Sequence, residues 1–255
     1  MTYTFKQNLV STSKYSIKCP NTMTPKYVVC HNTANDASAA NEISYMISNN
    51  NQVSYHIAVD DVNAIQGLPL DRNAWACGDG GSGQGNRYGI SVEICYSKSG
   101  GSKYTAAEEN AVYVIARLLY KYGLGIDALK QHYDFATNKK NCPHRIRDEK
   151  RWDGFEGRVQ WVLDEIKKGN IDSALESGTT GLKSTSTATT TTTSFLVEII
   201  CAELNIRKEA SFTSEIVGTV KKGEVFTAVD EQNGLYKLKS GAGWISAGPA
   251  YTKKK

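Results

Sequence analysis

Two histidines and one cysteine are the residues of this sequence best suited to bind a metal ion. His31 directly follows the apolar run 28–30 and therefore lies at or near the end of a predicted strand. His132 follows another short apolar run, and Cys142 lies ten residues further on in the polar segment 139–144. Basic neighbours favour the thiolate form of a cysteine. Two imidazoles and one thiolate form a three-ligand zinc set that leaves the fourth tetrahedral position open for water.

The spacing of these residues leaves a second interpretation open. His31 and His132 can be structural histidines with satisfied ring nitrogens, and Cys142 an exposed thiol. The chain has six cysteines, widely scattered and without a CxxC pair. We therefore expect no disulfide framework, and we expect most of the cysteines to be small buried residues.

Strands and helices alternate over residues 1–169. Apolar runs predict strands at 27–30, 53–59 and 89–96, and helical spacing predicts helices at 39–47, 105–122 and 152–168. For the central helix we expect Thr105 as the N-cap, Glu108 as its capping-box partner and Gly123 as the end. This alternation predicts an α/β domain with a mixed central sheet flanked by helices.

The composition changes near residue 170. More than half of residues 173–194 are Ser or Thr, which predicts a flexible linker over 170–194. Short β-like runs between Gly or Asn turns then predict a small all-β barrel at 195–255, and we expect residues 253–255 to be a solvated tail. The expected domains are therefore 1–169 and 195–255.

Charge and hydropathy exclude several classes of protein. A net charge of +4 over 255 residues is too small and too evenly spread for a nucleic-acid binder. No apolar run is long enough to span a membrane. Residues 1–10 are polar and lack the apolar core of a secretory signal, so we expect synthesis in a cytoplasm without a signal peptide.

Five ordered segments carry a resemblance to a known family. They are residues 29–33 (VCHNT), 55–61 (YHIAVDD), 75–80 (WACGDG), 90–94 (ISVEI) and 141–144 (NCPH). Over residues 1–168 the chain resembles the zinc-dependent N-acetylmuramoyl-L-alanine amidases of the type-2 amidase and peptidoglycan-recognition-protein superfamily. It is most similar to amidase endolysins of phages and prophages of Bacillus and related Gram-positive bacteria.

The resemblance implies a role for individual residues. The metal ligands of the family fall on His31, His132 and Cys142, implying one Zn²⁺ per catalytic domain. The catalytic acidic residue falls on Glu93, and the lysine two positions before the cysteine falls on Lys140. The gap between His132 and Cys142 is longer than we expect in close relatives, which is consistent with a loop insertion near residue 138. Lys139 is therefore an alternative to Lys140 for the family's lysine.

Further residues of these segments are expected to face the substrate. Tyr55 matches a tyrosine that some members place before the histidine of the second strand, and we expect it to assist catalysis. Asn32, Thr33, Trp75 and Asp79 are predicted to bind substrate. Three of the candidate site residues have a structural alternative: Glu93 as a salt-bridged carboxylate, Lys140 as a solvated loop charge and Trp75 as a core residue.

The implied reaction is hydrolysis of the amide between the muramic acid lactyl group and L-alanine. Zinc activates water and polarises the carbonyl. Glu93 would take the water proton and pass it to the leaving amine, and Lys140, with Tyr55, would stabilise the oxyanion.

The C-terminal part resembles the bacterial SH3-like family. The carrying segments are 204–207 (LNIR), 216–223 (IVGTVKKG) and 243–246 (GWIS). The resemblance implies a cell-wall-binding module, in which Trp244 and Tyr236 would line a groove; equally, Trp244 can be a core aromatic of a small barrel.

The expected partner is Gram-positive peptidoglycan, bound by a monomer that acts on the wall after release from the host. Two alternatives from neighbouring classes are a recognition protein that binds peptidoglycan without cutting it and a host autolysin. Cys142 favours an enzyme, because such recognition proteins typically lack the cysteine ligand. A third, a structural adaptor whose C-terminal domain binds proline-rich peptides, would leave the zinc residues unexplained.

Overall fold

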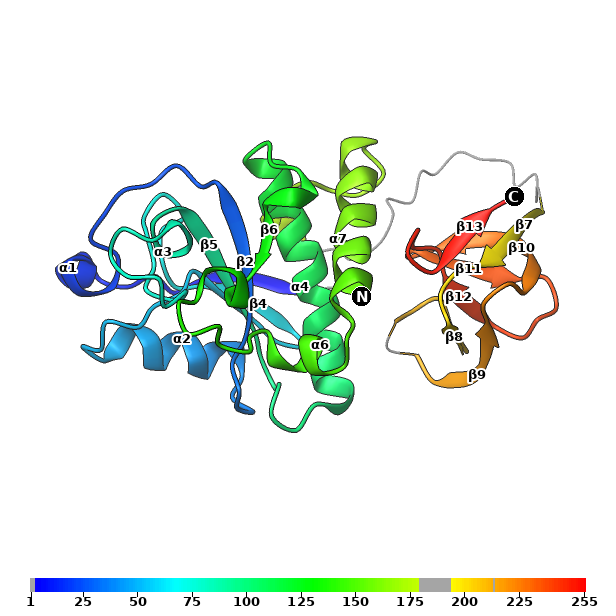
Figure 1. The fold of residues 1–255 in the computed structure, drawn as a ribbon, viewed down its shortest axis with the longest axis horizontal. Coiled ribbons are helices and arrows are strands. Elements are labelled where there is room, and N and C mark those ends of the chain that lie inside the picture. The colour runs from blue at the N-terminus through cyan, green and yellow to red at the C-terminus, as the bar shows by residue number, and fades with distance from the viewer. Residues whose placement is uncertain (1–2, 179–193, 213) are drawn as a thin grey trace. The chain divides into compact units, whose positions relative to one another are not determined.

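The computed structural model describes residues 3–178, 194–212 and 214–255. The described chain divides into two compact units (Figure 1). The first unit comprises residues 3–152 and 173–178, and the second comprises residues 153–172 and 194–255. Each unit is built around one β-sheet.

The first unit contains a mixed six-stranded sheet. Parallel pairing joins β1 to β4 and links β3, β5, β2 and β6 in that order, while β3 and β4 are antiparallel. The strands are, in sheet order, β1 (Thr4–Gln7), β4 (Asn63–Gln66), β3 (Ile57–Val59), β5 (Gly89–Ile94), β2 (Tyr27–Asn32) and β6 (Leu129–Gln131). The predicted mixed sheet is confirmed.

Helices cover this sheet. The long helix α4 (Gly101–Lys121) packs against β5, β2 and β3, and α2 (Ala39–Ser48) packs against β3 and β4 (Figure 1). Shorter helical segments are η1 (Thr12–Lys14), α1 (Tyr15–Lys18), α3 (Gln84–Tyr88), η2 (Ile126–Ala128), α5 (His132–Phe135), α6 (His144–Asp148) and η3 (Leu175–Ser177). Strands enclosed in this way are buried on both faces, which explains the continuous apolar run 28–30.

Two predicted element boundaries are wrong. The central helix begins at Gly101, four residues before the predicted cap, and Thr105 instead donates its hydroxyl to the carbonyl of Gly101. Glu108 is buried and binds the guanidinium of Arg151 rather than completing a capping box. The predicted strand 53–59 contracts to 57–59, because residues 53–56 form a loop in which the N–H of Ser54 donates to the carbonyl of Trp75 and not to a strand.

The second unit contains helix α7 and a seven-stranded antiparallel sheet. Helix α7 (Trp152–Lys167) matches the predicted last helix, and its apolar residues Phe155, Val159, Val162, Leu163 and Ile166 are buried. The strands are, in sheet order, β13 (Thr252–Lys254), β7 (Phe195–Ile199), β10 (Val225–Gln232), β11 (Leu235–Leu238), β12 (Trp244–Ser246), β8 (Glu203–Arg207) and β9 (Ile216–Lys221). The all-β prediction for this part is confirmed.

The C-terminal lysines are not a solvated tail. Lys253 and Lys254 lie in β13, which pairs with β7, although their side chains are exposed. Lys254 binds Glu231 at 3.1 Å and Lys255 binds Glu198 at 3.3 Å. Backbone pairing to an otherwise open strand edge therefore orders a segment whose composition suggested disorder.

The start of the predicted linker also differs from expectation. Residues 173–178 belong to the first unit, and Leu175 is 4% exposed. The hydroxyl of Tyr3 donates to the carbonyl of Leu175, and buried Arg117 donates to the hydroxyls of Tyr3 and Ser177. The buried side chain of Leu175 and these hydrogen bonds thus dock residues 173–178 on the first unit. Residues 179–193, the rest of the predicted linker, lie outside the described residues.

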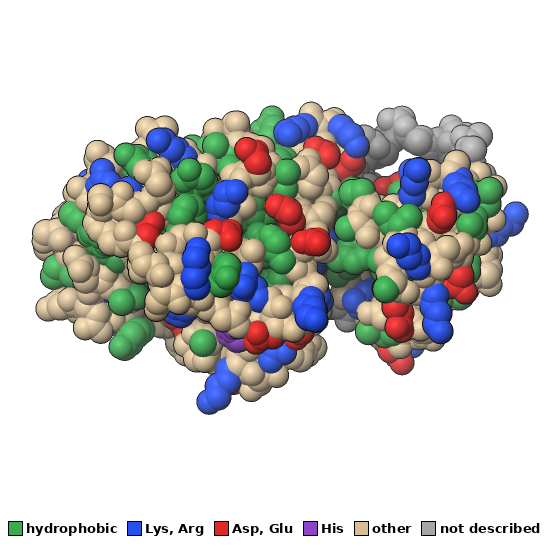
Figure 2. Space-filling model, viewed as in Figure 1, with side chains coloured by type: hydrophobic (Ala, Val, Ile, Leu, Met, Phe, Trp, Pro, Cys, Tyr) green, Lys and Arg blue, Asp and Glu red, His purple; other side chains and the backbone are tan. Residues whose placement is uncertain are grey.

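Charges are mixed on the surface. On the face in Figure 2, Lys and Arg side chains alternate with Asp and Glu over each unit, in keeping with the small net charge. Within the described residues, every helix is too short or too polar to cross a bilayer.

Docking of residues 173–178 predicts a stability effect. Leu175→Ala should lower the free energy of unfolding of the first unit by about 2–3 kcal/mol, the usual cost of a cavity left by a buried leucine. The matched control Leu9→Ala, at a leucine that is 42% exposed, should change it by less than about 0.5 kcal/mol. Urea unfolding followed by helical circular dichroism measures both. Equal effects of the two substitutions would show that the segment is not docked.

Candidate metal centre and active site

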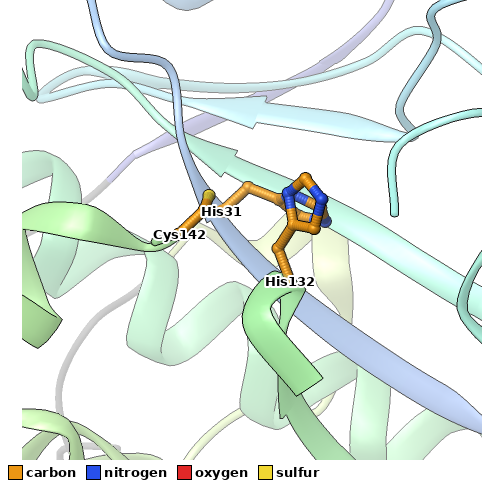
Figure 3. Close-up of side chains that lie close together, drawn as sticks. All are labelled: His31, His132 and Cys142. Atoms are coloured by element: carbon orange, nitrogen blue, oxygen red, sulfur yellow. The ribbon is translucent and has the colours of Figure 1, made fainter. Parts of the chain in front are cut away.

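Three side chains from three segments converge at one end of the first unit's sheet. His31 lies near the carboxyl end of β2, His132 follows β6 directly as the first residue of α5, and Cys142 precedes α6 (Figure 3). Because β2 and β6 pair in parallel, their carboxyl ends meet at the same edge. The ligand atoms of all three residues lie within 4.8 Å of one another, and the two Nδ1 atoms are 3.1 Å apart.

Apart from the contact between the two Nδ1 atoms, the hydrogen bonds of these residues run to the backbone. The imidazole of His132 also bonds the backbone of Cys77, an outer contact of the kind that fixes the tautomer of a ligating histidine. The Sγ atom of Cys142 accepts the backbone N–H groups of Asn32, at 3.4 Å, and of His144. The Nε2 atom of His31 is buried with no hydrogen-bond partner among the described residues.

Burial controls the protonation of this set. It lowers the pKa of His31 well below its ordinary value, and it lowers the pKa of His132 to about 4 with help from the charge of Lys140. Both imidazoles are therefore neutral near pH 7, the form that binds metals. Burial, followed by the charge of Glu93, raises the pKa of Cys142 to about 12.

The expectation that basic neighbours favour the thiolate is wrong for the metal-free chain. Cys142 is 3% exposed, and desolvation outweighs the nearby charge of Lys140. A bound cation must therefore displace the thiol proton. Two neutral imidazoles and one thiol, facing one another with two nitrogens 3.1 Å apart, fit a borderline-soft divalent cation.

Glu93 lies beside this cluster. Glu93, on β5, pairs in register with His31 on the neighbouring strand β2. Its Oε1 lies 3.9 Å from Nδ1 of His31. Its Oε2 is buried with no hydrogen-bond partner among the described residues. Burial, reinforced by the charge of Glu42 and opposed by that of Lys140, raises the pKa of Glu93 to about 8.

A cavity of about 310 Å³ opens beside the cluster. Glu93, His132, Lys140 and Cys142 all line it. Lys139 has a left-handed backbone (φ 51°), and its ammonium lies 5.3 Å from the ring centroid of Tyr133. Of the two rival lysines, Lys140 is therefore the one at the cavity.

Tyr55 also lines the cavity, but its hydroxyl has a partner. It donates to the carbonyl and to the Oε2 of Glu42, each at 2.9 Å. Burial and the charge of Glu42 raise the pKa of Tyr55 far above its ordinary value. The hydroxyl is thus a neutral donor that must leave Glu42 before it can donate elsewhere.

The four predicted substrate-binding residues divide into two pairs. Asn32 and Thr33 line the cavity. The side-chain Oδ1 of Asn32 also accepts a hydrogen bond from the backbone N–H of Arg145 at 3.0 Å. Trp75 and Asp79 lie outside the cavity lining. Asp79 accepts the backbone N–H groups of Gly85 and Asn86, which holds the start of α3. Substrate contacts by these residues stay a prediction.

Sequence reasoning missed one wall of the cavity. Glu42, Tyr45 and Met46 line it from one stripe of α2, at the i, i+3 and i+4 spacing of a helix face, and the C-cap residue Asn49 continues the stripe. The adjoining loop contributes Asn51 and Val53. The ammonium of buried Lys18 holds that loop, since it donates to Asn49 Oδ1 and to the carbonyls of residues 51 and 53. The spacing within α2 was the available signal, but it reads as an ordinary amphipathic helix.

The predicted wall-binding aromatics are buried in the second unit. Trp244 is 9% exposed, and Tyr236, at 6%, belongs to the hydrophobic core. The ammonium of Lys254 lies 5.1 Å from the ring centroid of Tyr236. A barrel of this size needs its few aromatic side chains for its core, so a groove lined by these two rings is not formed in this structure. Exposed apolar side chains of this unit are Leu196, Ile216, Val217 and Val225.

The donor set predicts a spectroscopic signature. Co²⁺ added to the purified chain should give thiolate-to-cobalt charge-transfer absorption at one ion per chain, because Cys142 is the sulfur ligand. Cys142→Ser should abolish the band, whereas Cys201→Ser, in the second unit, should retain it. A band that survives Cys142→Ser would mean that another thiol binds the ion.

Comparisons with known proteins agree with this geometry. Residues 21–145 match the Amidase_2 family model, described as N-acetylmuramoyl-L-alanine amidase, and residues 202–248 match the bacterial SH3 domain model. The N-acetylmuramoyl-L-alanine amidases XlyB and CwlA of Bacillus subtilis are each 54% identical to the chain, over 68% and 63% of its length. The chain spans 55% and 58% of those relatives, about half of their length.

A solved structure extends the match to the fold. The structure of PlyL is 55% identical to this chain, with a TM-score of 0.59, and the match covers 61% of this chain and 96% of PlyL. With this identity over nearly all of PlyL, and with His31, His132 and Cys142 gathered beside Glu93, the chain belongs to the Amidase_2 family of N-acetylmuramoyl-L-alanine amidases.

Proposed function

We propose that the chain is a zinc-dependent peptidoglycan hydrolase of the endolysin type. It cleaves the amide bond between N-acetylmuramic acid and the L-alanine of the stem peptide. The observation that carries this proposal is the convergence of His31, His132 and Cys142, with Glu93 and Lys140 in the wall of the same cavity. The choice of the scissile bond follows the names of the relatives, and the proposed mechanism follows from the side chains at the site.

The proposed metal is Zn²⁺, held by His31, His132 and Cys142. When bound, it supplies a Lewis acid that polarises the scissile carbonyl and acidifies a water molecule. Neutral imidazoles, a buried thiol and the lack of any hard oxygen ligand in the set favour zinc over Mg²⁺ or Ca²⁺.

Glu93 is the proposed proton carrier. Its Oε2, buried and without a hydrogen-bond partner among the described residues, accepts the proton of the attacking water and delivers it to the leaving amine of L-alanine. Lys140, an exposed residue of the cavity wall, is the proposed oxyanion donor, whose ammonium stabilises the negative charge that develops on the carbonyl oxygen. Tyr55 adds a second donor on substrate binding by releasing Glu42.

The C-terminal domain is the proposed wall anchor. We propose residues 1–169 as the catalytic domain and 195–255 as the SH3-like domain that binds Gram-positive peptidoglycan. Residues 170–194 join them, although residues 173–178 dock on the first unit and residues 153–172 group with the second. Tethering by such an anchor raises the local concentration of wall substrate around the catalytic domain. The chain acts as a monomer on the wall after its release from the host cytoplasm.

Mass spectrometry of digested Gram-positive peptidoglycan tests the proposal. The expected products are free stem peptides that begin with L-alanine, together with uncut glycan. A zinc chelator should abolish their release, and added Zn²⁺ should restore it. New reducing sugar ends or cuts inside the peptide would place the reaction at another bond, and binding without release would favour a recognition protein.

Glu93→Gln separates catalysis from metal binding. The substitution removes the proton carrier but keeps the size of the side chain, so amide hydrolysis should fall by about 10²–10⁴-fold. The zinc content, measured by atomic emission, should stay at one ion per chain. Glu176→Gln, at an exposed glutamate of the same unit, is the matched control. Full activity of the Glu93→Gln variant would remove Glu93 from the mechanism.

Removal of residues 195–255 tests the anchor. The shortened chain should bind purified cell walls more weakly in a pelleting assay, because the tether is lost. Its turnover of a small soluble muramyl peptide should change much less. Equal wall affinities of the full and shortened chains would exclude an anchoring role for the C-terminal domain.

A further inference from the structure

Arg147 connects the two segments that carry the second and third candidate metal ligands. It lies in α6, outside the cavity lining, and no sequence motif singled it out. We infer that Arg147 is a positioning residue that fixes the separation of His132 and Cys142 and the placement of Lys140. The inference rests on the zinc site of the proposed function, and on the proposed reaction only for its activity readout.

The guanidinium spans the two segments with directed hydrogen bonds. One Nη atom donates to Oε1 of Gln131 at 2.7 Å, and Nε donates to Oδ1 of Asn141 at 2.8 Å. Gln131 immediately precedes His132, and Asn141 stands between Lys140 and Cys142. One rigid planar group thus holds the chain neighbours of two ligands and of the candidate oxyanion donor.

An aromatic ring completes the connection. The guanidinium carbon of Arg147 lies 3.6 Å from the ring centroid of Tyr133, the residue after His132. The backbone N–H of Tyr133 donates to the carbonyl of Cys142 at 2.9 Å. Stacking on the ring fixes the plane of the guanidinium, and hence the direction of both of its hydrogen bonds.

The ligand loop depends on this connection because it has few other supports. Residues 137–141 are exposed, and the backbone of Lys139 is left-handed. The backbone N–H of Lys140 donates to the Oδ1 of nearby Asn138, and the hydroxyl of Thr137 donates to the carbonyl of Gly78 at 3.2 Å. Asn141 is held from the other side, where its amide donates to Oδ1 of Asp148 at 2.7 Å. Helix α6 therefore supplies both groups that hold Asn141.

Loss of this connection should weaken metal retention. Groups that orient metal ligands from outside the ligand set typically change metal affinity or activity by about 10–100-fold when substituted. Arg147→Met keeps much of the apolar stem but removes both hydrogen bonds, and Arg147→Lys keeps the charge but not the planar fork. Both variants should lose zinc faster than the wild type, the methionine variant more.

The test measures zinc release from the purified full-length chain to an excess of a chromogenic chelator. We expect Arg147→Met to release zinc about 10-fold faster or more and to lower kcat with little change in KM. The melting temperature of the metal-free chain should change little, whereas the increase on adding zinc should shrink. Arg87→Met is the matched control, since the Arg87 guanidinium lies over Tyr88 in α3, 5.9 Å from its ring centroid.

A double substitution, Arg147→Met with Asn141→Ala, tests whether Arg147 acts on the ligands through Asn141. If Arg147 acts through Asn141, the effects of the two substitutions on the release rate should be less than additive in free energy. Wild-type release rates in Arg147→Met, or an unchanged zinc-induced rise in melting temperature, would overturn the inference. If Arg147→Met releases zinc faster but the wild type has no amidase activity, the proposed function is overturned and the positioning role stands.

Discussion

The parallel pairing of β2 with β5 and β6 is the constraint on which the candidate site depends. It places His31 opposite Glu93 in register and brings the end of β6, and so His132, to the same sheet edge. Cys142 joins them because Tyr133 binds its carbonyl and Asn32 binds its sulfur. Residues more than 100 positions apart in the chain thereby come within 4.8 Å of one another, and His132, Cys142 and Glu93 line one cavity.

Desolvation sets the protonation states of the side chains in this cluster. The same burial that keeps both imidazoles neutral also protonates the thiol and raises the pKa of Glu93 to about 8. A metal-free cluster is therefore almost uncharged, apart from Lys140 at its exposed side. A divalent cation reverses this situation, because it stabilises the thiolate and the carboxylate that burial disfavours.

The sequence predicted those parts of the fold that leave a periodic signal. The apolar run 28–30 indicated β2, and the helical stripe of 105–122 indicated most of α4. The family resemblance, not a period, implied His31, His132 and Cys142 as ligands, and the structure brings these three side chains together. The start of α4 was missed because Gly100 caps the helix without a side chain. Leu175 and the final lysines were misassigned because their order comes from tertiary contacts, namely docking by Tyr3 and pairing with β7. Arg147 leaves no local pattern, and the spacing of the α2 wall is that of any amphipathic helix.

Zinc X-ray absorption on the purified full-length chain tests the central claim most directly. The account predicts one zinc per chain with two nitrogen ligands at about 2.0–2.1 Å, one sulfur ligand at about 2.3 Å and one further light-atom ligand. Cys142→Ser should remove the sulfur shell alone. A spectrum without sulfur, or with two or more sulfur ligands, would contradict the assignment of His31, His132 and Cys142 as the metal centre.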